Sequence, residues 1–155
     1  TAEPVAEDGT DEASEASSDE VPEETSTVAE AAPADCPLDR ATIEATMGGE
    51  GFEEPEMNTQ EDGFDCTFIR KDQLGSIAVS VMSSSAAYPG IAATMPDAEP
   101  VSGIGDKALY SPGITRLISE VDGKTLAVQL ISVAFSTEEA RTKAIALGRA
   151  AAERL

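Results

Sequence analysis

The chain has no histidine and no tryptophan among its 155 residues, and it has only two cysteines. Without an imidazole base, neither a Ser-His-Asp nor a Cys-His arrangement can be built for nucleophilic catalysis. The motifs Gly-x-Ser-x-Gly and Ser-x-x-Lys are also absent from the sequence. Acidic residues are plentiful, but none stands in an apolar stretch that would raise its pKa for acid catalysis. We therefore expect a protein that is not an enzyme.

Basic residues are scarce: the chain has ten Lys and Arg but 30 Asp and Glu, which gives a net charge of −20. A nucleic-acid surface needs clustered Lys or Arg to meet the phosphates, and these ten are dispersed along the chain. The same acidity disfavours an anionic membrane surface. No apolar run approaches the roughly 20 residues of a membrane-spanning helix. We expect no nucleic-acid partner, and membrane attachment only through an anchor outside this sequence.

The two cysteines, Cys36 and Cys66, are too few for a zinc site, which usually takes four ligands. A disulfide between them is the simpler interpretation, and it would indicate an oxidising, extracytoplasmic compartment. The alternative is a pair of buried free thiols in a cytosolic protein. The acidic stretch 50–63 does not match the Asp-x-Asp-x-Asp-Gly spacing of a calcium loop, which favours a solvated loop. We expect neither a metal nor a cofactor.

Residues 1–35 differ in composition from the rest of the chain. They hold twelve acidic residues, no basic or aromatic residue, and three valines as their only aliphatic residues larger than alanine. Such a segment cannot bury enough apolar surface to offset the entropy of ordering it. We expect a disordered acidic tether at 1–35 and a folded domain at 36–155. A solubilising tail, or a decoy for basic partners, remains an alternative.

The chain begins at Thr1 rather than Met, so we expect that a signal peptide was removed. An acidic spacer of this kind is similar to the segment behind a lipidated N-terminal cysteine in bacterial surface lipoproteins. That cysteine is not in this sequence, and the lipid anchor is a hypothesis.

Capping and periodicity predict two helices. The first begins at Asp39 as N-cap, with Leu38 and Ile43 spaced as a hydrophobic staple, and ends at Gly48-Gly49. The last spans about 137–154, with Ser136 and Glu139 spaced as a capping box. Its apolar stripe consists of Ala140, Ala144, Leu147, Ala151 and Leu155.

Alternating and β-branched segments predict strands at 64–70, 76–82, 107–111, 114–121 and 124–135. Residues 83–95 are ambiguous between a short helix and a loop. The clearest signal is Asp122-Gly123, a two-residue hairpin turn that sets Val121 opposite Lys124. We assign to the core the face with Leu117, Val121, Leu126, Val128 and Leu130. The predicted fold is α+β: an antiparallel sheet of about five strands, with the N- and C-terminal helices packed on one face and one disulfide.

Two further groups of residues are candidates for a site. Met82, Tyr88, Met95 and Tyr110 could line an apolar ligand pocket, although such residues are more often plain core. Gly103-Ile104-Gly105-Asp106 is superficially similar to a dinucleotide-binding loop. That loop must follow a strand and open a helix, whereas this segment follows a proline-containing loop and enters a strand. We interpret Gly103, Gly105 and Asp106 as a structural turn.

The motifs Asp35-Cys36-Pro37-Leu38, Cys66-Thr67-Phe68 and Val101–Ala108, followed by an alanine-rich helix ending at Leu155, are similar to an uncharacterised domain of actinobacterial secreted lipoproteins. The resemblance covers about residues 35–155. Phe68 stands where tryptophan is common in that group, and the usual lipobox is missing here. The resemblance implies an extracytoplasmic α+β domain, but it does not imply any particular activity.

Together these observations favour a cell-envelope binding or interaction module of the lipoprotein type, without catalytic activity. The alternative is a carrier or sensor for a small apolar ligand. The partner would be an envelope protein in the first case and a small molecule in the second.

Deleting residues 1–33 should leave the thermal melting of the domain nearly unchanged, because an acidic segment of this composition contributes little to the core. We expect melting temperatures of the truncated and full chains, followed by circular dichroism, to agree within about 4 °C, the shift that roughly 1 kcal/mol produces in a domain of this size. A larger drop would mean that the segment packs on the domain.

Overall fold

Seven strands and three helices make up the described part of the computed structural model, which comprises residues 35–49, 51–131 and 133–155. Apart from Asp35, the expected tether lies outside these residues. The helices are α1 (Arg40–Met47), α2 (Ala87–Ala92) and α3 (Thr137–Ala152). The strands are β1 (Glu56–Gln60), β2 (Gly63–Ile69), β3 (Ser76–Met82), β4 (Glu99–Val101), β5 (Lys107–Ser111), β6 (Arg116–Val121) and β7 (Lys124–Ile131).

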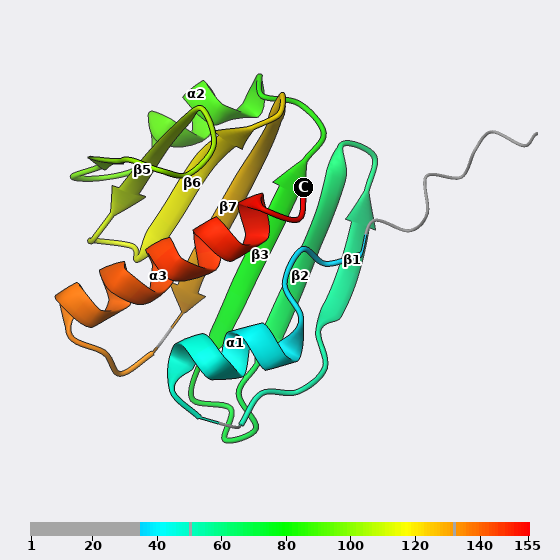
Figure 1. The fold of residues 1–155 in the computed structure, drawn as a ribbon, viewed down its shortest axis with the longest axis vertical. Helices are drawn as coiled ribbons and strands as arrows, with labels where there is room; N and C mark the ends of the chain where they lie inside the picture. Colours follow the sequence, from blue (N-terminus) through cyan, green and yellow to red (C-terminus); the bar gives the residue numbers. More distant parts are fainter. Residues whose placement is uncertain (1–34, 50, 132) are drawn as a thin grey trace, which may run out of the picture. The chain divides into compact units, whose positions relative to one another are not determined.

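All seven strands belong to one antiparallel sheet, in the spatial order β1-β2-β3-β7-β6-β5-β4 (Figure 1). The chain builds this sheet as two meanders, β1–β3 and β4–β7. The segment containing α2 carries the chain from the end of β3 to the far edge, where β4 begins the second meander. The meanders meet at the centre, where β3 pairs with β7 and Val79 lies opposite Val128.

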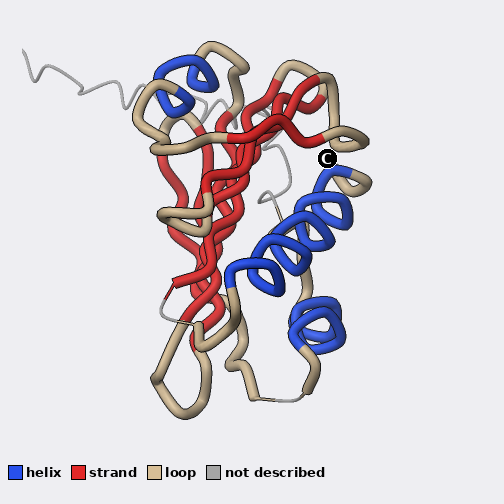
Figure 2. The backbone as a smooth tube through the Cα atoms, turned by 90° about the vertical axis from the view of Figure 1, so that its left-hand side faces the viewer, coloured by secondary structure: helices blue, strands red, loops and turns tan. Residues whose placement is uncertain are grey.

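The two faces of the sheet are covered unequally. Helices α1 and α3 lie on one face and α2 on the other (Figure 2). The main core lies under α1 and α3, and in β2 and β3 every second residue points into it. The five residues assigned to the core from the hairpin, Leu117, Val121, Leu126, Val128 and Leu130, are all buried there. A smaller cluster between α2 and the sheet contains Tyr88, Met95, Ile118 and Ala127.

Both terminal helices begin as the sequence predicts. The Asp39 carboxylate accepts a hydrogen bond from the Thr42 N–H at 2.7 Å. This hydrogen bond and the nearby Arg154 guanidinium lower the pKa of Asp39 to about 2. Arg154 Nη1 lies 2.9 Å from Asp39 Oδ2. Ser136 and Glu139 form the predicted capping box of α3. The Asp39–Arg154 pair links the start of α1 to the chain just beyond α3.

The sheet is larger than the predicted five strands. β1 lies inside the stretch 50–63 that we expected to be a solvated loop, and β4 is an additional three-residue strand at the opposite edge. All five residues of β1 are exposed, so this strand has no apolar alternation for the sequence to display. It is held by its pairing with β2, in which Gln60 lies opposite Gly63 across a two-residue connection.

The hairpin prediction is confirmed in its register, because Val121 pairs with Lys124 and Leu117 with Val128. Its second strand, β7, is shorter than expected and ends at Ile131. The ambiguous segment 83–95 contains the short helix α2.

A disulfide joins Cys36 to Cys66, with the two Cα atoms 6.0 Å apart. Cys66 is fully buried on β2, and Cys36 lies four residues before α1 begins. The bond therefore ties the chain entering α1 to the second strand of the sheet.

Replacing Cys36→Ser should lower the free energy of unfolding by about 2–5 kcal/mol, because the open chain regains the entropy that the cross-link removes. Urea denaturation without reductant measures this loss. The wild-type protein in excess reductant serves as the control, and its free energy of unfolding should fall to that of the variant. Equal stability of variant and wild type without reductant would show that the cross-link is not formed.

Candidate functional site

The four residues predicted to line an apolar pocket do not come together in one cluster. Tyr88, a residue of α2, and Met95, three residues beyond that helix, belong to the same buried cluster. Tyr110 belongs to the main core, on the other face of the sheet. Met82 ends β3 and is only partly buried. The structure thus brings together two of the four side chains.

The environment of Tyr88 is partly polar. The Lys107 ammonium lies 4.7 Å from the centre of the Tyr88 ring, and Lys107 also pairs with Glu120 on the neighbouring strand, with Nζ and Oε2 2.7 Å apart. Burial raises the pKa of Tyr88, and the nearby Lys107 charge opposes that shift. Tyr88 is therefore a neutral, packed ring with a cation over its face.

Tyr110 is fully buried, and its hydroxyl has no hydrogen-bond partner among the described residues. Burial raises the pKa of this phenol, so Tyr110 is neutral at physiological pH. The residue fills volume in the main core and exposes no reactive oxygen to solvent.

The segment around Gly103 and Gly105 is a tight turn packed on β6. Both glycines have positive φ, 78° and 54°. A Cβ atom added to Gly105 would lie 2.1 Å from the Glu120 carbonyl oxygen, so the close approach of the two backbones requires glycine. The buried Ser119 hydroxyl donates to the Ile104 carbonyl at 3.0 Å, and the Asp106 N–H donates to the Glu120 carbonyl at 2.8 Å. These bonds secure the turn before β5.

On the face that carries α2, a large part of the sheet has no helix over it. Helix α2 covers Ile118 and Ala127 of β6 and β7. On β2 and β3, by contrast, the residues on this side remain half-exposed among the described residues. We call this surface the open sheet face; it comprises Asp65, Thr67, Ile69, Ser76, Ala78, Ser80 and Met82.

One end of the open sheet face is apolar and hollowed. A hollow of about 540 Å³ is lined by Thr67, Ile69, Gln73, Leu74, Gly75, Ser76 and Ile131. Leu74 is 68% exposed and Ile131 is 40% exposed. We call this site the apolar hollow. No sequence pattern predicts this site directly, although an isolated leucine in the turn between two predicted strands is a usable signal.

The described residues contain no cluster of three or more side chains that could hold a metal ion. Within the same part of the chain, no helix is long and apolar enough to cross a membrane.

Searches against protein-family models, characterised proteins and solved structures find no significant match to this chain.

Replacing Gly105→Ala should destabilise the domain by about 1–3 kcal/mol, because the new methyl group must displace the backbone of β6. Gly123→Ala is the matched control: Gly123 also has positive φ, at 76°, but an added Cβ would meet no atom within 4 Å. Gly123→Ala measures the cost of placing alanine at a positive φ without a steric clash. Gly105→Ala should therefore lower the urea midpoint more than Gly123→Ala does. Equal losses in the two variants would mean that the close approach is not required.

Proposed function

We propose that this domain is a binding module of the cell envelope that contacts a protein partner through the apolar hollow of the open sheet face. The observation that carries the proposal is the exposure of Leu74 and Ile131 around a hollow whose lining, among the described residues, includes no charged side chain. Charged residues make up 26% of the whole chain, so an uncharged apolar site is a marked departure from its composition.

The chemistry of the apolar hollow suits a protein surface of moderate polarity. Apolar side chains that remain exposed together on a soluble domain mark interaction sites. Here they are flanked by Thr67, Gln73 and Ser76, which can exchange hydrogen bonds with a partner at the rim. Because β2, β3 and β7 are paired strands of the central sheet, Ile69 and Ile131 are held on a rigid frame.

An extracytoplasmic location is part of the proposal. The Cys36–Cys66 disulfide supports it, because such bonds persist mainly in oxidising compartments. The resemblance to secreted lipoprotein domains points in the same direction. In this picture, the acidic N-terminal segment is a spacer that holds the module away from the surface to which it is anchored.

A non-catalytic role accords with the chemistry of the serines between β3 and α2. The Ser83 hydroxyl donates to the Asp62 carbonyl at 3.0 Å, and the Ser84 hydroxyl accepts from the Ala86 N–H at 3.1 Å. Both hydroxyls stabilise the turn, and the chain has no histidine to activate them.

The alternative, a carrier of a small apolar ligand next to Tyr88 and Met95, would require these side chains to move apart. Each is only 6% exposed and packs against Ile118 and Ala127. For that reason we favour the protein-binding proposal.

A photo-crosslinking amino acid, p-benzoylphenylalanine, introduced at Leu74 in the native cells should give a discrete protein adduct. The same group at Thr142, an exposed position on α3, is the matched control and should not give that adduct.

Once mass spectrometry identifies the captured protein, the purified partner should bind Leu74→Asp at least about tenfold more weakly than wild type, and Thr142→Asp normally, because a buried charge opposes apolar contact. Identical adducts from the two positions, or unchanged affinity of Leu74→Asp, would contradict the proposal.

A further inference from the structure

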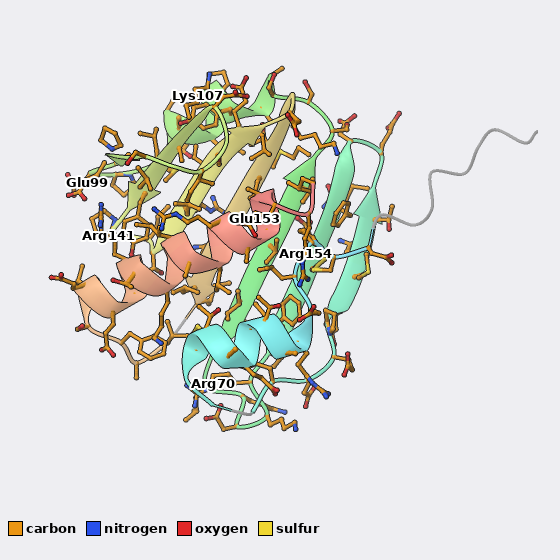
Figure 3. All side chains as sticks on the ribbon, in the orientation of Figure 1. Arg70, Glu99, Lys107, Arg141, Glu153 and Arg154 are labelled. Carbon is orange, nitrogen blue, oxygen red and sulfur yellow. A yellow bond between two sulfur atoms is a disulfide. The ribbon has the colours of Figure 1, made fainter. Side chains whose placement is uncertain are left out.

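A second hollow lies at the C-terminal end of α1, against the turn between β2 and β3. Its volume is about 450 Å³, and it is lined by Met47, Gly48, Gly49, Gly51, Phe52, Arg70, Lys71, Asp72 and Phe135. Figure 3 shows Arg70 at this end of the molecule, beside α1. We call this site the cationic hollow. Its volume falls within the roughly 300–1,000 Å³ of small-molecule sites.

The walls of the cationic hollow combine apolar surface with open backbone. Met47, Phe52 and Phe135 supply a thioether and two aromatic rings. A Cβ atom added at Gly49 or at Gly51 would meet no other atom within 4 Å, so the glycines leave room at this wall. An apolar body of ligand size can therefore contact side chains on one side and backbone on the other.

Two basic side chains line the same space, and a third lies beside it. Arg70 and Lys71 line it, and the Lys143 ammonium lies 4.9 Å from the centre of the Phe135 ring at its rim. Arg70 forms an ion pair with Asp72, with Nη2 and Oδ2 2.6 Å apart. Lys71 and Lys143 form no ion pair among the described residues. Asp72 and the Glu44 carboxylate held by the adjoining loop offset part of this charge, which leaves one net positive charge among the described groups at the hollow, in a chain of net charge −20.

The backbone of the same loop already binds one carboxylate. Glu44 Oε1 accepts from the N–H groups of Gly51 and Phe52, at 3.1 and 3.3 Å. These two bonds lower the pKa of Glu44, so the carboxylate is charged and holds the loop in place. Because Glu44 occupies these donors, an anionic ligand must be met by the ammonium and guanidinium groups instead.

We propose that the cationic hollow binds a small amphiphilic anion, a carboxylate or sulfonate attached to an aliphatic or aromatic body. The body would lie against Met47, Phe52 and Phe135. The charged head would accept hydrogen bonds from Lys71 and its basic neighbours, the charge-assisted bonds that hold carboxylates most strongly. This site is separate from the apolar hollow and does not rest on the proposed protein-binding function.

The probe for the test is 8-anilinonaphthalene-1-sulfonate, whose fluorescence rises when its rings leave water, titrated into the full-length protein. Binding should saturate at one site and be displaced by decanoate. Lys71→Gln should weaken the binding by about tenfold, the loss of one charge-assisted hydrogen bond. Gly49→Leu should weaken it at least as much, because the new side chain occupies the hollow.

Matched controls separate this site from others on the surface. Gly90→Leu places the same side chain at another glycine with free space around its Cβ, and Arg149→Gln removes a charge elsewhere; both should bind the probe normally. Leu74→Ser should also bind normally, which excludes probe bound at the apolar hollow. All variants should have the melting temperature of the wild type. Gly49 and Gly90 have room for a side chain, and the other replaced side chains lie at the surface.

Three results would overturn the proposal: the absence of saturable probe binding, unchanged binding by both Gly49→Leu and Lys71→Gln, or displacement of the probe by decanol as readily as by decanoate. The last result would mean that the site has no preference for an anion. None of these outcomes would affect the photo-crosslinking result at Leu74.

Discussion

The pairing of β3 with β7 is the contact on which the rest of the fold depends. Among the described strands, the two meanders pair only there, over seven residue pairs from Ser76–Ile131 to Met82–Thr125. The inward apolar side chains of both strands are at most 4% exposed, and Val79 and Val128 are completely buried. Without this pairing the described strands would form a three-stranded and a four-stranded sheet, and β3 and β7 would each become an unpaired edge strand.

The two proposed sites follow from how the helices cover this sheet. Helices α1 and α3 bury one face, whereas α2 is short and covers only part of the other. The open sheet face therefore ends in the apolar hollow, where Leu74 and Ile131 remain exposed. The cationic hollow lies where α1 stops at Gly48 and its loop meets the β2–β3 turn. Each site therefore lies where the helices no longer cover the sheet.

Local signals in the sequence predicted much of the fold. The Asp39 and Ser136 caps and the Asp122-Gly123 hairpin specify short-range geometry, and the structure contains all three. Strand β1 could not be predicted in this way, because its residues are exposed and it is ordered by its pairing with β2. Neither hollow was predicted, since the residues that line the cationic hollow, such as Met47 and Phe135, are brought together only by the tertiary fold. The predicted pocket grouped Tyr88 with Tyr110 although they lie on opposite faces.

Native-state hydrogen exchange measured at increasing urea tests most directly whether the β3–β7 pairing makes the two meanders one cooperative unit. Protected amides of β2 and β3 should exchange through the same unfolding reaction as those of β6 and β7, with equal free energies and equal dependence on urea. If the amides of one meander exchanged at a distinctly lower free energy while the other stayed protected, the meanders would be independent units, and the account would be contradicted.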